Sequence, residues 1–152
     1  AQDMIAVEEE IAQQVRYLEI ERMRFPGRLH YFVRIDPDAN GWSIPALIIQ
    51  PLIENAVKYG VSTTDKPVNI IISAQIQGDR LRISVANDGR IAVPTGPSDD
   101  RAAGTGTGLT NIQDRLRALY GKNASLLLAN NQDGMATATI VLPDSSMIFQ
   151  DI

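Results

Sequence analysis

Apolar residues recur with two different periods along this chain, and the change from one period to the other predicts the order of its elements. Residues 7–24 carry one apolar stripe at helical spacing, formed by Val7, Ile11, Val15, Leu18 and Met23. Residues 44–60 and 109–120 show the same spacing, which predicts two more helices. Five segments alternate apolar and polar residues as half-buried strands do: residues 28–36, 68–77, 80–87, 124–130 and 136–142.

Turn-forming residues separate these elements. Pro26 and Gly27 end the first helix, and Gly121 closes the last one. Gly78-Asp79 joins residues 68–77 and 80–87 into an antiparallel hairpin, and a turn around Asp133-Gly134 joins the last two strands. The resulting order predicts an α+β fold, a two-layer sandwich with helices on one face of a mostly antiparallel, mixed sheet.

Two connections are expected to be irregular. Residues 61–67 form a polar loop, and residues 88–103 form a longer loop rich in Gly, Pro, Ser and Asp. A structureless connection of that length inside a compact domain is usually functional, often a lid over a ligand. A disordered insertion is the alternative interpretation.

The ends of two helices carry further signals. The run Glu8-Glu9-Glu10 suits the positive end of the first helix dipole, and the pattern places it on a solvated face. Thr110 with Gln113 has the spacing of a capping box at the start of the last helix.

The helix at residues 44–60 combines a strongly aliphatic side with a polar edge. Pro45 suits a first-turn position, whereas Pro51 lies inside the pattern and is expected to bend the helix. Gln50, Glu54 and Lys58 follow one another at i, i+4 and i+8. Asn55 stands beside them although Asn is a mediocre helix former, which indicates a ligand with negative charge and a metal.

Composition removes several classes of function. The chain has no Cys and one His, which excludes disulfides, thiolate zinc sites, Cys nucleophiles and His-paired zinc motifs. A net charge of −4 argues against a nucleic-acid binder. No apolar run is long enough to span a bilayer. Because the sequence opens AQDMIAVEEE without an initiator Met, we expect it to be a piece of a longer protein.

The glycine run Gly104-Thr-Gly106-Thr-Gly108 leads directly into the last helix. Alternating glycines before a helix leave backbone N–H groups free to bind an anion, although a flexible hinge has the same appearance. No Lys follows Gly108, so this is not a Walker A loop, and the spacing differs from a dinucleotide fingerprint.

Taken together, the motifs resemble a known family. Glu54-Asn55-x-x-Lys58-Tyr59, then Asn87-Asp88-Gly89, then the glycine run occur in the order found in the ATP-binding (Bergerat) domain shared by sensor histidine kinases, Hsp90, type II topoisomerases and MutL. More narrowly, YLEIERMRF, IPALIIQPLIENAVKYG and GTGTGLTNIQDRLRALYG are similar to LytS/YehU-type bacterial sensor histidine kinases. The likeness covers residues 15–142.

The resemblance implies ATP and Mg²⁺ as ligands and a role for each matching residue. Asn55 would offer its amide oxygen to Mg²⁺, Lys58 would contact phosphate and Tyr59 would lie against adenine. Glu54 would support this site from beside it or have a structural role. Asn87 or Asp88 would accept a hydrogen bond from the adenine amino group, with Gly89 leaving room for the base. The end of the lid would cradle phosphate and close the site with Gly104, Gly106, Gly108 and Leu109.

The sequence departs from the family at two places. The adenine motif usually runs Asp-x-Gly-x-Gly, whereas this chain has Asn87 at the carboxylate position and lacks the second glycine. ATP-hydrolysing relatives place a Glu one helical turn before the Asn, and that position is Pro51, which has no acid–base group. We therefore expect poor hydrolysis and transfer of phosphate to a protein instead.

The resemblance further implies a catalytic domain without its acceptor. His30 lies on a strand, so the phosphoaccepting His would belong to an upstream dimerising region, and a response regulator would receive the phosphate. Residues 1–27 would connect to that region, 28–143 would bind ATP and 144–152 would form a tail. The domain would be cytoplasmic, with the parent anchored in the inner membrane. A nucleotide-free interaction module, an ATPase of the same fold and an anti-sigma serine kinase are the alternatives.

Overall fold

The computed structural model describes residues 3–89 and 106–148 of the 152-residue chain. Its helices and strands follow in the order β1 Met4–Ala6, α1 Val7–Arg24, β2 Leu29–Ile35, β3 Ser43–Pro45, α2 Gln50–Thr63, β4 Val68–Gln77, β5 Arg80–Asp88, α4 Gly106–Tyr120, β6 Ser125–Asn130 and β7 Met135–Leu142. Single 3₁₀ turns occur at Pro37–Ala39, Gly121–Asn123 and Ser145–Met147.

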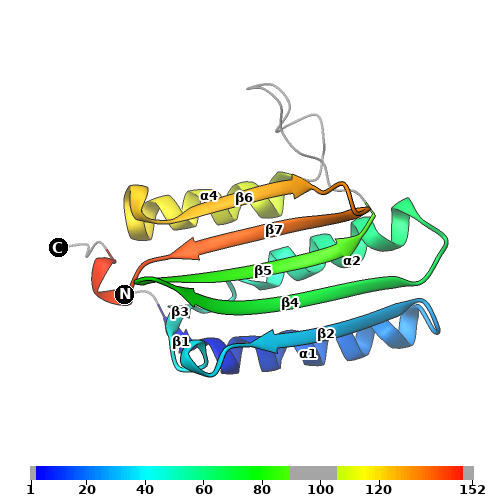
Figure 1. The fold of residues 1–152 in the computed structure, drawn as a ribbon, viewed down its shortest axis with the longest axis horizontal. Helices are drawn as coiled ribbons and strands as arrows, with labels where there is room; N and C mark the ends of the chain where they lie inside the picture. The colour runs from blue at the N-terminus through cyan, green and yellow to red at the C-terminus, as the bar shows by residue number, and fades with distance from the viewer. Residues whose placement is uncertain (1–2, 90–105, 149–152) are drawn as a thin grey trace.

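One mixed sheet forms the first layer of the fold. It has five strands in the order β2-β4-β5-β7-β6, in which β2 pairs with β4 in parallel and the other neighbours are antiparallel. A separate two-stranded pair joins β1 to β3. Helices α1, α2 and α4 all lie on the same face of the large sheet, with α2 between the other two (Figure 1). The α+β sandwich expected from the sequence is therefore confirmed.

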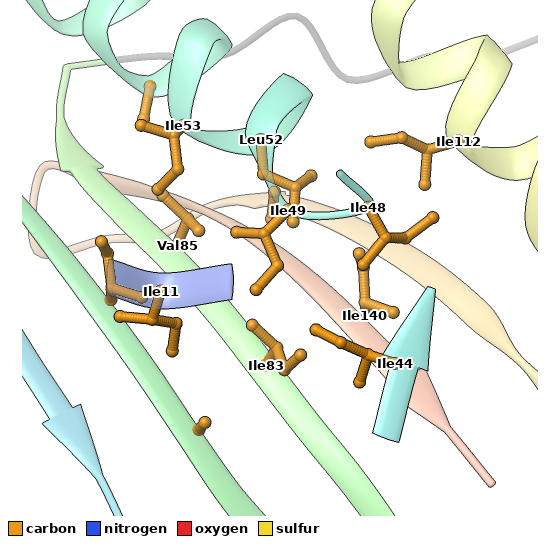
Figure 2. Close-up of a cluster of buried hydrophobic side chains, with 14 of the residues drawn as sticks. Ile11, Ile44, Ile48, Ile49, Leu52, Ile53, Ile83, Val85, Ile112 and Ile140 are labelled. Carbon is orange, nitrogen blue, oxygen red and sulfur yellow. The ribbon is translucent and has the colours of Figure 1, made fainter. Parts of the chain in front are cut away.

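The core fills the space between the helices and the sheet. Ile11 of α1, Leu52 of α2 and Ile112 of α4 point toward Ile83 and Ile140 of the sheet (Figure 2). Because Val7, Ile11 and Leu18 are buried with these residues, α1 is packed into the same core as the rest of the chain. None of the helices in the described part of the chain is long and apolar enough to cross a bilayer.

Gly60 sets how closely α2 approaches the sheet. A Cβ atom at this position would lie 2.5 Å from Cγ1 of Val68 and 3.4 Å from the carbonyl oxygen of Asp88. The first distance is shorter than carbon atoms tolerate, so only glycine allows this approach. Gly60 thereby brings the second half of α2 against the end of β5.

The predicted start of α2 is wrong. Residues Ile44 and Pro45 belong to β3, a turn occupies residues 46–49, and the helix begins at Gln50. Leu47 in that turn has φ 64°, a left-handed conformation that interrupts a helix. Pro51 consequently lies in the first turn of α2, where its missing N–H has no partner to lose, and it causes no bend.

The described residues correct four smaller expectations. Helix α2 continues to Thr63, so the beginning of the expected loop at residues 61–67 is helical. Because α4 begins at Gly106, Thr110 lies inside it and forms no capping box. Helix α1 has the predicted bounds, but Met23 is 80% exposed and does not belong to the buried stripe. Glu8 and Glu9 are exposed as expected, whereas Glu10 is 0% exposed.

Candidate functional site

Asn55 lies in the middle of α2, whose second half is brought close to the sheet at Gly60. Its side chain is partly buried, and Nδ2 is buried without a hydrogen-bond partner among the described residues. An uncommitted carboxamide in a helix that is otherwise well packed is costly, because each buried polar group without a partner destabilises the fold. The amide nitrogen of Asn55 is therefore available to donate a hydrogen bond to a ligand.

Glu54 and Lys58 lie on the side of α2 that faces α1. Together with Tyr17 and Glu21 of α1 they line a groove between the two helices. Lys58 is exposed, and its Nζ lies 6.0 Å from the centre of the Tyr59 ring. Burial, together with the negative charges of Glu21 and Glu54, raises the pKa of Tyr17 to about 12. Glu54 and Lys58 thus both line this groove, and Asn55 is not among its lining residues.

Alternation along β5 decides which of its last two side chains faces the helices. Leu81, Ile83 and Val85 are buried beneath the helices, and Asn87, 2% exposed, continues this row. Asp88 belongs to the other row, because successive side chains of a strand point to opposite faces. Asn87 is therefore the residue of the pair that lies on the same side of the sheet as α2.

Asp88 is held by its own neighbours. Its Oδ2 accepts hydrogen bonds from the backbone N–H of Asn69 at 2.7 Å and from the side-chain amide of Asn69 at 3.0 Å. Its carbonyl oxygen accepts a bond of 2.8 Å from Nδ2 of Asn87. Asp88 consequently ties the ends of β4 and β5 together and fixes the orientation of the Asn87 amide.

The remaining predicted site residues surround the same end of the sheet. Gly89 has φ 104°, a conformation that side chains rarely adopt, and its N–H donates to the carbonyl of Gly134 at 3.1 Å. Gly106 and Gly108 form the first turn of α4, and Leu109 is buried in the core. Gly104 and most of the predicted lid, residues 90–103, lie outside the described residues.

The aromatic residue predicted to contact a base is partly buried. Burial raises the pKa of the Tyr59 hydroxyl, which therefore stays neutral at physiological pH. Among the described residues no group of three or more His, Asp or Glu side chains gathers to hold a metal ion. Any metal at this site would accordingly take most of its ligands from something other than the protein, as Mg²⁺ bound to phosphates does.

Sequence reasoning missed two residues that meet at the start of α2. The Glu10 carboxylate accepts hydrogen bonds from the N–H groups of Leu47 and Ile49, and Arg115 donates to the carbonyl of Ala46. The backbone groups that Glu10 and Arg115 bind lie more than 35 residues away from them in the sequence, so no motif or spacing predicts these contacts.

Comparison of this geometry with solved structures defines the class of protein. The catalytic domain of the histidine kinase ThkA matches it with a TM-score of 0.68, covering 95% of this chain and 97% of that one at 14% identity. The fold is thus that of a histidine kinase catalytic domain. Residues 43–146 match the family described as histidine kinase-, DNA gyrase B-, and HSP90-like ATPases. The chain belongs to this family of ATP-binding domains.

Curated relatives agree with this placement. Sensor protein LytS of Staphylococcus epidermidis is 30% identical over 149 residues, which cover 93% of this chain and 25% of the relative. Sensor histidine kinase YesM of Bacillus subtilis is 31% identical over 146 residues, which cover 93% of this chain and 24% of the relative. The chain therefore spans about a quarter of the length of these proteins. The resemblance to LytS-type sensor histidine kinases is confirmed.

Proposed function

We propose that this chain is the Mg²⁺–ATP-binding catalytic domain of a two-component sensor histidine kinase, and that Asn55 is its metal ligand. The observation that carries the proposal is that Nδ2 of Asn55 is buried without a partner among the described residues, so a ligand is needed to satisfy this amide. Nδ2 would donate to an acceptor such as a phosphate oxygen, and Oδ1 is the atom that would hold the metal. A carboxamide oxygen suits a hard cation, and Mg²⁺ typically takes one or two ligands from the protein and the rest from phosphates and water. Bound Mg²⁺ would neutralise phosphate charge and orient the γ-phosphate.

Lys58 contacts the phosphates in this proposal, and Glu54 has a structural role beside it. Lys58 follows Asn55 by three residues, so the two side chains leave neighbouring positions on the helix surface. Its exposed ammonium group can reach a phosphate as a point charge without breaking an ion pair in the described part of the chain. The N–H groups of the glycine-rich start of α4 would provide further phosphate contacts.

For adenine we propose Asn87 rather than Asp88. Asn87 lies on the helix-covered face of the sheet, whereas the Asp88 carboxylate is engaged by Asn69. Asn87 Oδ1 would accept a hydrogen bond from the adenine amino group, Tyr59 would lie against the base and Gly89 would leave room for it. A carboxamide is a weaker acceptor than a carboxylate, so we expect modest affinity.

The proposed reaction is transfer of the γ-phosphate to a protein. The imidazole of a His outside this chain would attack the γ-phosphorus, a P–N bond would form, and the bond to the bridging oxygen would break to release ADP. Pro51, in the first turn of α2, offers no base to activate water, which favours transfer over hydrolysis. A response regulator Asp would receive the phosphate next.

The assignment extends to the organisation of the parent protein. Residues 1–27 would connect to an upstream dimerisation and phosphoacceptor region, residues 28–143 would bind ATP and residues 144–152 would form a tail. The domain would lie in the cytoplasm, with the parent anchored in the inner membrane. Because His30 lies on strand β2 and the accepting His would belong to the upstream region, we expect no phosphate to appear on this chain alone.

Titration calorimetry with a non-hydrolysable ATP analogue tests the proposal. We expect binding that requires Mg²⁺ for full affinity and that falls at least about 10-fold in Asn55→Ala. Glu54→Gln serves as the matched control, because it changes the neighbouring side chain on the groove side of α2. Absence of binding at millimolar analogue would refute the proposal and favour a nucleotide-free interaction module instead.

A further inference from the structure

The N-terminus of α2 lacks the groups that usually complete a helix start. Its N-cap residue is Ile49, which has no side chain able to accept a hydrogen bond, and no acidic residue occurs in the first turn. The first N–H groups of a helix need acceptors, and the helix dipole favours a negative charge beside them. In this protein an acceptor from another helix instead binds the N–H groups of the turn that leads into α2.

Glu10 of α1 supplies that acceptor. Its carboxylate is 0% exposed, and its two oxygens accept the N–H groups of Leu47 at 3.1 Å and of Ile49 at 3.2 Å. Both oxygens are therefore used, and both bonds end in the turn at residues 46–49. A buried carboxylate is costly unless it is fully hydrogen-bonded, so this arrangement commits α1 to one position relative to the turn.

Arg115 of α4 holds the same turn from the other side. Its Nη2 donates to the carbonyl oxygen of Ala46 at 2.5 Å. Burial lowers the pKa of Arg115, and the negative charge of nearby Glu10 opposes that effect. Since Leu47 has φ 64°, the turn is held in an unfavourable conformation by its surroundings.

The side chains of the turn complete the attachment. Ile48 and Ile49 are fully buried and point into the core, Ile48 near Ile112 of α4 and Ile140 of the sheet, and Ile49 toward Ile83 of the sheet (Figure 2). Peptide groups and side chains of four residues thus connect α1, α4 and the sheet to the first turn of α2. Asn55 lies less than two helical turns further along the same helix.

We propose that Glu10 is a positioning residue for the nucleotide site: acting through the turn at residues 46–49, it holds α2 where Asn55 meets the metal and its phosphates, and Arg115 acts as its counterpart on α4. This inference rests on the proposed function of Asn55. Because Glu10 belongs to α1, a displacement of α1 relative to α2 changes the same hydrogen bonds. The position of α1 therefore sets the affinity of the site for Mg²⁺–nucleotide.

The test compares Glu10→Gln with Glu9→Gln, a matched control on the exposed face of the same helix. The amide of Gln keeps the size of the side chain but turns one acceptor oxygen into a donor. Binding of a non-hydrolysable ATP analogue is measured on the full 152-residue chain with Mg²⁺ and with a chelator. Each variant is measured well below its own thermal midpoint, so that loss of folded protein cannot mimic loss of affinity.

We expect Glu10→Gln to weaken binding about 10-fold with Mg²⁺ and to leave binding under chelator nearly unchanged. Glu9→Gln should bind as the parent does. In an Asn55→Ala background the Glu10 substitution should have no further effect, because its influence passes through Asn55. A general loosening of the fold would instead weaken binding equally with and without Mg²⁺, and that result would overturn the proposal.

Failure of the inference differs from failure of the proposed function. If the parent chain binds Mg²⁺–nucleotide and Asn55→Ala weakens it, unchanged affinity in Glu10→Gln overturns the inference alone. If the parent chain does not bind Mg²⁺–nucleotide at all, the inference and the proposed function are both overturned. If Glu10→Gln does not fold, the same binding measurements are made on Arg115→Gln, with the exposed Arg117→Gln as its control. Equal affinities in that pair would overturn the inference.

Discussion

The close approach of α2 to the sheet makes Gly60→Ala an informative substitution. The new methyl group would lie 2.5 Å from Cγ1 of Val68, which is fully buried and β-branched and therefore has few alternative rotamers. The contact with the Asp88 carbonyl at 3.4 Å is ordinary. To admit the methyl group, either Val68 or the whole second half of α2 must move.

The expected magnitude follows from two opposing effects. Overpacking a close-packed interface costs about 1–3 kcal/mol. Alanine inside a helix is better than glycine by about 1 kcal/mol. We therefore expect Gly60→Ala to lower the free energy of unfolding by about 1 kcal/mol, which corresponds to a fall of about 2–4 °C in the thermal midpoint for a domain of this size.

A double-mutant cycle with Val68→Ala isolates the clash. Val68→Ala alone should cost about 2 kcal/mol, because it removes buried methyl groups. In that background the obstructing Cγ1 is gone, so Gly60→Ala should now stabilise the protein by about 1 kcal/mol through helix propensity. Urea unfolding of the four proteins gives the coupling free energy. Equal destabilisation by Gly60→Ala in both backgrounds would refute the explanation of the glycine.

Three further substitutions test other parts of the structure. Leu47→Gly should raise the free energy of unfolding by up to about 1 kcal/mol, because φ 64° favours glycine and the leucine is 53% exposed; a lower urea midpoint would contradict this. Burial raises the pKa of Tyr120 to about 12, so the free energy of unfolding should be independent of this group below pH 10 and should fall by roughly 3 kcal/mol between pH 10 and 12. Tyr120→Phe should flatten this fall and should slightly raise stability at pH 8, because it removes a buried hydroxyl that has no partner among the described residues; an equally steep fall would argue against the assignment. Asn87→Asp should tighten ATP binding about 5-fold and leave GTP binding unchanged, because a carboxylate accepts a stronger hydrogen bond from the adenine amino group than a carboxamide does. Equal gains in affinity for both nucleotides would exclude Asn87 as the adenine contact.

The elements of this protein could largely be predicted from its sequence. The apolar period of α1 and β4 gave their bounds correctly, and Gly78-Asp79 predicted the hairpin between β4 and β5. Local periodicity succeeds here because each element buries one face, so the pattern of side chains and the backbone conformation have the same cause. The motifs around Asn55 and the glycine run indicated the family for a related reason: each motif is a short run of neighbouring residues that can be read without the fold.

The start of α2 shows why the same reasoning has a limit. The apolar run at residues 44–60 is continuous at helical spacing, yet residues 44–45 form a strand and the helix begins only after a left-handed residue. The peptide groups of that turn find their partners on Glu10 and Arg115, far away in the chain. Hydrogen bonds of this kind replace those of a helix only in the folded protein, so no local pattern records them.

The sequence by itself determined the order of the three helices and of the five strands of the large sheet, the family and the identity of most residues proposed for the nucleotide site, but it did not indicate the small strands β1 and β3. Only the tertiary structure decided that Glu10 is buried, that Asn87 rather than Asp88 faces the helices, and where α2 begins. The physical reason is the range of the interactions. Periodicity and turn chemistry act between neighbours in the chain, whereas a buried carboxylate or an amide without a partner depends on groups that meet only when the layers pack.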